Sequence, residues 1–440
     1  MLPLPHISAW DPRATSAGSI DPLGALRAYN ALATTLLPGA TTVTTRVRYL
    51  SWVCAGLHLL DEVPDAPRGG QDGRARRQRV LAWERLVALA TGLYANSSND
   101  DLAWNGMRGV SYVKRAIADQ KCSVDYPLLK NQAGVGGVGT YWVTMVNGGL
   151  VEDASAQLTP RGVELAEAFL AHSHIPRKDL RPLLSGARPK FDREDLTEWG
   201  SSVNLGMASI SKKERALLAD ALLEPPAHRR IAAALNGVKH AISDHAAFQR
   251  LHKRLMVKAD SFAINLAAVV TVIQAFESIH TSLLDCFDRM RSANIHGMPV
   301  SLKDVVSLIG MPPDLVERSH ALQQAIDLST GALPRIVASS ARDFLGAIQP
   351  IVSATTAEEF SKQLIRHHER VQAGKLDASR QPKQPWVALV GERNASIKIA
   401  PRFALDGTPQ PRESGSFTHP YRLESFAGML TQANGWEVSR

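Results

Sequence analysis

Residues 148–161 have the sequence GGLVEDASAQLTPR, which contains the clearest fold signal in the chain. The paired glycines end a helix, and Leu150–Asp153 and Gln157–Thr159 are typical of two short strands joined by a tight turn. The second strand ends in a threonine that can cap a helix, with Pro160 at the favoured first helical position. The segment therefore predicts a two-stranded wing followed by a helix over Arg161–Leu170.

Three short helices are expected upstream of this wing. Their ranges are Val110–Asp119, Asp125–Asn131 and Thr140–Asn147, and a glycine-rich turn, Gly134–Gly139, precedes the third. Helix, turn, helix, wing and closing helix is the order of a winged helix-turn-helix. We therefore predict a winged-helix-like module over residues 110–172.

The rest of the chain predicts a mainly α, multi-domain protein. Its 440 residues are too many for one compact core, and aromatic residues make up only 6%, which favours helices over sheets. Helical spacing marks Leu23–Leu37 and Thr45–Leu60, whereas Trp386–Val390 and Ser396–Ile399 predict a small C-terminal β-hairpin. We expect five segments: an N-terminal helical domain (1–109), the winged-helix-like module (110–172), a linker (173–210), a helical bundle (211–373) and the β-hairpin with a short helix (374–440).

Composition favours a polyanionic partner and a reducing compartment. The net charge is +8, and the three cysteines are too few and too widely spaced for a disulfide framework or a CxxC metal site. The N-terminus has no signal-peptide pattern. The most apolar stretch, Phe262–Phe276, is shorter than the ~18–20 residues of a membrane span and predicts a buried core helix. We expect a cytoplasmic protein without a membrane partner.

No motif specifies a catalytic site. The chain has no phosphate-binding loop, no HExxH and no GxSxG motif. Gly134, Gly136 and Gly139 match GxGxxG literally, but the residues before them are too polar for a buried strand and the following helix ends early. A turn between two short helices is the better interpretation, so we expect no catalytic residue, cofactor or metal.

One histidine-rich segment leaves a metal-dependent nuclease open. His367, His368 and Glu369 lie near the end of an expected helix, where neighbouring positions diverge by about 100°. A metal site would therefore need His280 or His419 from elsewhere in the chain. A solvated helix end that complements the helix dipole is the simpler interpretation.

Two basic clusters and the winged-helix-like module are candidate contacts for nucleic acid. Basic side chains would hold phosphates, polar ones would reach base edges, and Trp386 beside the second cluster would stack a base. The candidates are Arg74, Arg76, Arg77, Arg79, Lys114, Arg115, Lys130, Gln132, Thr140, Tyr141, Lys375, Arg380 and Lys383. A solvated loop and a core tryptophan are the alternative. The module itself has six acidic and five basic residues, which keeps protein docking open.

The segment LLPGATTVTTRVRYLSW, residues 36–52, resembles a signature of uncharacterised bacterial proteins often encoded in defence or mobile-element loci. Those proteins share LxPGxTTxTxRxRY, an arginine-rich helix ending in a glutamate, and a YW pair. The matches here are Arg76–Arg79 with Glu84, and Tyr141-Trp142. The resemblance covers the N-terminal third of the chain and implies a subunit of an anti-phage or anti-plasmid system, without an established activity.

The signature also contains two arginines, Arg46 and Arg48, which lie on different faces of the expected helix. We expect one of them to form a structural ion pair with an acid such as Asp61 or Glu62.

These features predict a non-catalytic subunit of a bacterial defence assembly that binds nucleic acid, in the first place duplex DNA, through phosphate contacts. Protein partners in a multi-subunit assembly are part of this prediction. The first alternative is a protein–protein adaptor whose winged helix docks a partner enzyme. The second alternative is a metal-dependent nuclease.

Overall fold

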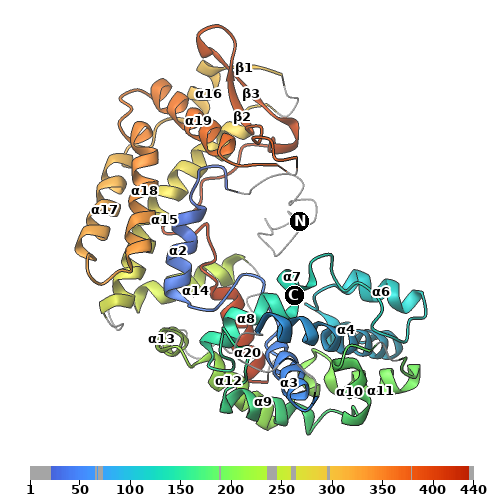
Figure 1. Cartoon of the computed structure of the whole chain (residues 1–440). Coiled ribbons are helices and arrows are strands. Elements are labelled where there is room, and N and C mark those ends of the chain that lie inside the picture. Colours follow the sequence, from blue (N-terminus) through green and yellow to red (C-terminus); the bar gives the residue numbers. More distant parts are fainter. Residues whose placement is uncertain are drawn as a thin grey trace. The chain divides into compact units, whose positions relative to one another are not determined.

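The computed structural model describes residues 21–64, 67, 73–187, 190–234, 245–258, 264–294, 298–377 and 379–435. This part of the chain is mainly helical with one small sheet, as predicted (Figure 1). Its contacts divide it into two compact units. Unit 1 contains Met1–Leu36 and Phe248–Tyr421, and unit 2 contains Leu37–Ala247 and Arg422–Arg440. Both units combine stretches far apart in sequence, which differs from the five consecutive segments expected.

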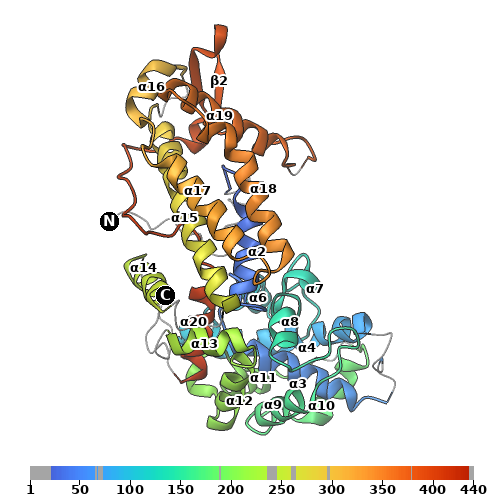
Figure 2. The same ribbon diagram turned by 90° about the vertical axis from the view of Figure 1, so that its left-hand side faces the viewer.

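Unit 1 is built on four helices that pack in a closed ring, and Figure 2 shows them running along one another. They are α2 (Leu26–Leu36), α15 (Ile264–Arg291), α17 (Leu315–Leu328) and α18 (Arg335–Val352). By length and composition α15 could cross a membrane, but 67% of its most apolar window is buried inside the protein. It is the core helix of this unit, as predicted for the described part of Phe262–Phe276.

A small antiparallel sheet lies in unit 1, with strand order β1–β3–β2. The predicted hairpin is formed by β2 (Val387–Val390) and β3 (Ser396–Ile399), in which Val387 lies opposite Ile399. The edge strand β1 (Val300–Ser301) was not predicted, because two residues are too few to show a strand period. The remaining elements of this unit are α14 (His245–Val257), α16 (Leu302–Ile309), α19 (Ala357–Ala373) and the 3-10 helices Glu392–Asn394 and Pro401–Phe403.

Unit 2 is organised around α3 (Tyr49–Asp61) and α4 (Gly73–Ser98). The Ala-, Leu- and Arg-rich sequence of α4 favours a long helix, and its second half is buried because helices surround it. Its tightest crossing is with α11 (Arg193–Val203), where a Cβ added to Gly200 would lie 2.1 Å from the Ala90 carbonyl oxygen. Only a glycine allows the two backbones to approach this closely.

The predicted linker at 173–210 is instead structured. It contains α10 (Arg177–Leu184), α11 and the 3-10 helix Met207–Ser209, and both α-helices pack against α4. Leu183 and Trp199 are among their buried residues, so this stretch contributes to the core. The other helices of unit 2 are α5 (Asp101–Trp104), α6 (Val110–Ala118), α7 (Gln132–Val135), α8 (Gly137–Asn147), α9 (Pro160–Leu170), α12 (Lys212–Leu222), α13 (Pro226–Ala234) and α20 (Leu423–Ala433).

Three of the helices expected between residues 110 and 172 are confirmed as α6, α8 and α9. Thr159 caps α9 by accepting a hydrogen bond from the Gly162 amide, as predicted. The two expected strands are reduced to one antiparallel bridge between Val151 and Leu158. Because α6 packs on α4, and α8 and α9 pack on α3, the segment is an integral part of unit 2.

The prediction of a helix over Asp125–Asn131 is wrong. This stretch is irregular, with Tyr126 and Leu128 buried on either side of Pro127. The helix α7 starts only at Gln132, because Asn131 acts as its N-cap by accepting from the Gly134 amide. The glycines expected to form a loose turn therefore lie within and between α7 and α8.

Candidate functional sites

The signature segment, residues 36–52, builds a buried polar network in unit 2. The Arg46 amide donates to the Tyr141 hydroxyl at 2.8 Å, and the Tyr141 ring stacks on Tyr49 with centroids 4.7 Å apart. Arg48 is 1% exposed and pairs with Glu214 of α12 at 3.2 Å. The expected structural ion pair therefore forms, but with Glu214.

Further acceptors surround the Arg48 guanidinium. It donates to the Ser202 and Ser209 carbonyl oxygens at 2.8 Å each, and to the Asn204 carbonyl oxygen. A buried guanidinium must have such partners, because an unpaired buried charge is strongly unfavourable. The signature arginine thus ties α3 to the 202–214 stretch.

Three of the predicted nucleic-acid contacts are wrong because their side chains are buried. Arg76 pairs with Asp61 at 2.6 Å and donates to the Ala156 and Pro67 carbonyl oxygens. Tyr141 is fully buried in the signature network, and Gln132 donates to Glu84 and to a backbone carbonyl of α4. These three side chains hold unit 2 together and offer no surface to a polyanion.

Glu84 occupies the N-terminal end of α8, where a dinucleotide phosphate would have to bind. Its carboxylate accepts from the Gly137 amide and, at 2.9 Å, from Gln132 Nε2. A Cβ on Gly137 would lie 2.5 Å from the Tyr49 ring, so this glycine serves close packing. The GxGxxG match is therefore filled by the protein's own carboxylate. Burial raises the pKa of Glu84, and the hydrogen bonds from Gln132 and Gly137 offset that effect only in part.

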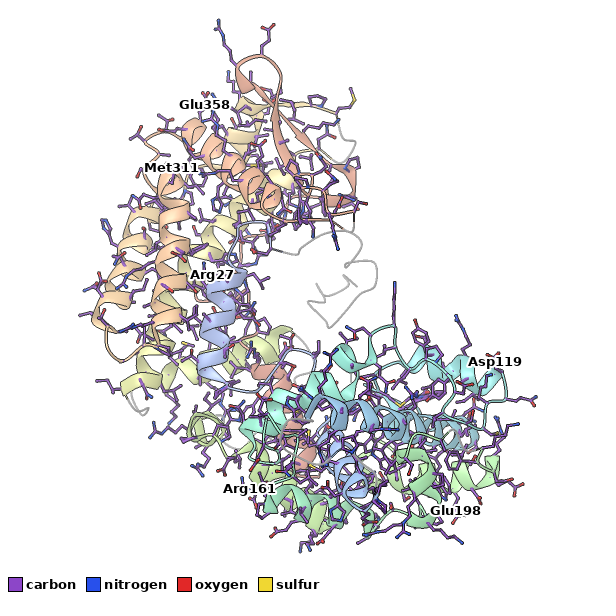
Figure 3. The ribbon with its side chains drawn as sticks, in the orientation of Figure 1. Arg27, Asp119, Arg161, Glu198, Met311 and Glu358 are labelled. Atoms are coloured by element: carbon purple, nitrogen blue, oxygen red, sulfur yellow. The ribbon has the colours of Figure 1, made fainter. Side chains whose placement is uncertain are left out.

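The other candidates of unit 2 reach its surface to different degrees. Arg74, Lys114, Arg115 and Lys130 are exposed, whereas Arg77, Arg79 and Thr140 are half-buried. Two of the cations lie over aromatic rings, Arg77 over Trp142 at 4.8 Å and Lys114 over Trp104 at 4.7 Å. Asp119, labelled in Figure 3, is the C-cap of α6, so an acid follows the helix that carries Lys114 and Arg115.

The cluster beside the β-hairpin in unit 1 is less accessible than expected. Lys375 is half-buried and pairs with Asp21 at 3.6 Å, and Lys383 is half-buried too, whereas Arg380 and Arg393 are exposed. Trp386 is buried and stacks on Phe403 with centroids 4.5 Å apart. It is a core tryptophan and offers no face to a base, which corrects its assigned role.

A polar cavity of about 510 Å³ opens beside α4 in unit 2, and we call it the α4 cavity. Arg79 and Arg85 of α4 line it, together with the 124–127 stretch and the residues after α10. Arg79 donates to the Ser185 carbonyl oxygen and Arg85 to Gln132, each at 2.9 Å, so both guanidiniums are held in place. The sequence indicated Arg79, but Arg85 was not predicted.

Two exposed lysines lie close in sequence to the walls of the α4 cavity. Lys121 precedes the 124–127 wall, and Lys190 follows the 186–187 wall. A β-bridge between Ser123 and Lys190 joins the two walls. Among the residues that line the cavity, the two guanidiniums of Arg79 and Arg85 accompany one carboxylate, that of Asp125.

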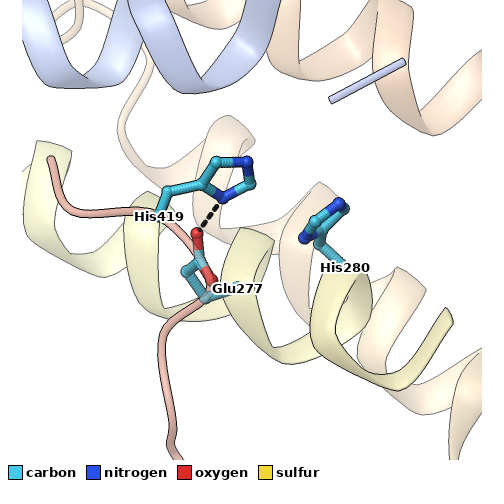
Figure 4. Close-up of side chains that lie close together, drawn as sticks. All are labelled: Glu277, His280 and His419. Atoms are coloured by element: carbon cyan, nitrogen blue, oxygen red, sulfur yellow. Dashed lines mark hydrogen bonds and ion pairs between the residues drawn. The ribbon is translucent and has the colours of Figure 1, made fainter. Parts of the chain in front are cut away.

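Three side chains able to bind a metal meet in unit 1 (Figure 4). Glu277 and His280 lie one turn apart on α15, and His419 comes from the segment before α20. One ligand atom from each lies within 4.8 Å of the others. Glu277 and His280 are buried, while the His419 side chain is 16% exposed.

The Glu277 carboxylate is the centre of this cluster and receives four hydrogen bonds. His419 Nδ1 and the Tyr421 hydroxyl contact one oxygen at 2.6 and 2.7 Å. The amide and hydroxyl of Thr418 donate to the other oxygen at 2.6 and 2.8 Å. Thr418 Oγ1 also lies 2.9 Å from His280 Nδ1 and 3.0 Å from His419 Nδ1, so it is near all three candidate ligands.

The electrostatics of the cluster favour a charged glutamate beside a neutral histidine. Burial alone raises the pKa of Glu277, but the charge and hydrogen bond of His419 outweigh burial and lower that pKa to about 2. Burial, followed by the charge on His419, lowers the pKa of His280 to about 3. His280 is therefore unprotonated near neutral pH, which is the form that binds metals.

The histidine-rich segment of α19 does not form the constellation considered for a nuclease. His367 and His368 bind the carbonyl oxygens of Leu23 and Pro22, each at 2.8 Å, and Glu369 accepts from the Leu389 amide. These side chains fix residues 22–23 and strand β2 against α19. His419 instead joins His280, and Glu277 was missed although the Glu-x-x-His spacing places both α15 residues on one helix face.

No protein-family model matches this chain, and no match was found among curated proteins or solved structures.

Proposed function

We propose that this protein is a non-catalytic nucleic-acid-binding subunit of a bacterial defence assembly, and that unit 2 holds duplex DNA by its phosphates. The observation that supports the proposal is the α4 cavity, which Arg79 and Arg85 line and whose walls lie close in sequence to the exposed Lys121 and Lys190. The resemblance of residues 36–52 to proteins of defence loci supports the biological setting.

The chemistry of the cavity suits phosphate. A guanidinium donates two parallel hydrogen bonds to phosphate oxygens, and one already held by a neighbouring oxygen loses less entropy on binding. Arg79 and Arg85 are both held in this way, by Ser185 and Gln132. The nearby lysines are exposed cations that would attract the following phosphates of a strand.

The surface of α8 favours binding without base recognition. In a winged helix this position belongs to the recognition helix, whose exposed polar residues contact bases. Here Tyr141, Trp142 and Met145 are buried, and the most exposed residue is Val143 at 52%. Duplex DNA would therefore be held through its backbone, with little dependence on its sequence.

Exposed apolar residues of α7 and α8 support protein docking as the second candidate function. Val135, the last residue of α7, and Val143 of α8 are exposed apolar side chains without a charge between them along the chain. Exposed apolar residues of this size are typical of interaction surfaces when they lie together. An adaptor would use these two residues, whereas phosphate binding would use the α4 cavity.

Titration of a fluorescent duplex at several salt concentrations tests the proposal. We expect log affinity to fall linearly with log salt, with a slope of about −0.9 for each phosphate contact. The double variant Lys121→Ala/Lys190→Ala should bind at least tenfold more weakly and lose about two units of slope. The matched control is Lys303→Ala/Lys398→Ala, which removes two exposed lysines of unit 1.

Two results would overturn the proposal. A slope near zero for the unmodified chain would remove phosphate contacts and favour the adaptor. Equal weakening by both double variants would show that overall charge, and not the α4 cavity, attracts the DNA.

A further inference from the structure

We propose that Glu277, His280 and His419 form a binding site for a divalent transition-metal ion, Zn²⁺ in the first place, that fastens the 416–421 segment to α15. The site lies within unit 1 and is independent of the nucleic-acid function proposed for unit 2.

The donor set fits zinc chemically. Two imidazole nitrogens and one carboxylate oxygen are a common protein ligand set for zinc, and thiolates are not required. Thr418 Oγ1 adds a nearby oxygen, 2.8 Å from the Glu277 carboxylate and 2.9 and 3.0 Å from the two histidines. The four polar atoms therefore come from two segments 138 residues or more apart that already converge.

The spacing of these atoms is close to that of a coordination shell. Ligands about 2.0–2.1 Å from a tetrahedral zinc ion are roughly 3.3 Å from one another. The observed separations run from 2.6 Å, between His419 Nδ1 and Glu277, to within 4.8 Å for the three ligand atoms as a set. Side-chain adjustments of about half an ångström to one ångström would therefore suffice.

The surroundings orient each ligand in advance. The Tyr421 hydroxyl and the Thr418 amide fix the Glu277 carboxylate, as hydrogen bonds to ligating carboxylates commonly do. Tyr29 stacks on His419 with ring centroids 4.5 Å apart, and Phe276 stacks on His280 at 5.8 Å. The rings are therefore held by packing as well as by hydrogen bonds.

Zinc binding would release one proton from the cluster. His419 Nδ1 and the Glu277 carboxylate are hydrogen-bonded at 2.6 Å without a metal. Zinc would take the place of the proton in this hydrogen bond, the proton would leave to solvent, and the +2 ion with the buried carboxylate would carry one net positive charge. Three protein ligands leave one tetrahedral position for a further ligand. Because Glu277 and His280 are buried and only His419 of the three reaches the surface, the ion would be enclosed by the protein and would have a structural role.

Equilibrium dialysis of the full chain, after chelator treatment, against ZnCl₂ tests the site. We expect one zinc ion per chain, and at least a tenfold weaker Kd for His280→Ala and for His419→Ala. The matched control is His320→Ala, which removes an exposed histidine of α17 in the same unit. Zinc should also raise the melting temperature of the unmodified chain and of H320A, but not that of H419A.

The unmodified chain alone can refute the proposal, so a variant that fails to fold does not leave it undecided. Folded protein that retains no zinc after dialysis would show that the cluster is a proton-bound network only. Zinc binding that H320A weakens as much as H419A would assign the metal to the surface and would also overturn the site.

Discussion

Glu84 of unit 2 and Glu277 of unit 1 are both buried carboxylates on helices, yet their pKa values shift in opposite directions. Glu84 faces an amide side chain and a backbone amide, and burial raises its pKa. Glu277 faces His419 and receives three further hydrogen bonds, and its pKa falls to about 2. Burial therefore does not decide the charge of these groups; the charge of their partners does.

A third buried glutamate shows that a charged partner is not peculiar to unit 1. Glu214 lies in unit 2, as Glu84 does, but it pairs with the guanidinium of Arg48. Arg48 and Glu214 therefore form a buried ion pair within unit 2. We therefore expect removal of a charged partner to lower the free energy of unfolding more than neutralisation of a carboxylate whose partners are neutral.

The largest effect is expected for Arg48→Met. This change leaves Glu214 as a buried charge without its partner and removes the donor to three backbone carbonyls, so unit 2 should lose about 3–5 kcal/mol. Urea denaturation followed by tryptophan fluorescence measures it, because Trp52 and Trp83 are buried in this unit. The control Arg74→Met alters an exposed position of α4 and should stay within about 0.5 kcal/mol. Equal losses would show that burial of the guanidinium is irrelevant.

An intermediate loss of stability is expected at low pH, because of Glu277. Its folded pKa of about 2 lies below the ordinary value of 4.5, so the unfolded chain takes up the proton first and stability falls as the pH drops from 4.5 to 2. Glu277→Gln should cost about 1.5–3 kcal/mol near neutral pH and flatten the stability profile in that window. Unfolding followed by far-UV circular dichroism at a series of pH values measures both. An unchanged profile in the variant would remove the assigned charge of Glu277.

The smallest effect is expected for Glu84→Gln, at about 1 kcal/mol or less. A glutamine oxygen can still accept from the Gly137 amide, so one hydrogen bond at most is lost. The sign of the pH dependence is opposite, because a raised folded pKa makes Glu84 reduce stability as the pH rises from 4.5 through that pKa. Fluorescence-monitored denaturation at a series of pH values above 4.5 should show this decrease in the unmodified chain and not in the variant. A loss as large as that of Arg48→Met would contradict the comparison.

Helices and the hairpin were predictable because their signals are local. The periodic apolar residues of Thr45–Leu60 gave α3, and the alternating pattern of Ser396–Ile399 gave β3. Asp125–Asn131 failed because Tyr126 and Leu128 are buried by neighbouring helices in an irregular chain, which no local period reveals. That Glu84 accepts from the Gly137 amide in the glycine-rich stretch after it depends on tertiary structure and could not be predicted.

The candidate sites were less predictable, since they depend on contacts between distant residues. Arg74 and Arg76 are the same residue type two positions apart on α4. Arg76 is buried because it shares a helix face with Val80 and Trp83. That period was available in the sequence. His419, in contrast, lies 142 residues from Glu277, and no local pattern links them. The Lys121 and Lys190 stretches likewise meet at the bridge between Ser123 and Lys190, which no local pattern indicates.

The helix α20 belongs to unit 2 although the chain before it, up to Tyr421, belongs to unit 1. Its Gln432 side chain accepts from the Val47 amide and donates to the Thr45 carbonyl, across 385 and 387 residues. At ribosomal speeds of about 5–20 residues per second, Gln432 emerges roughly 20–80 s after Val47. During that interval the signature segment lacks these partners, so unit 2 can complete its fold only late in translation, and chaperones would meet it while it is still unfinished.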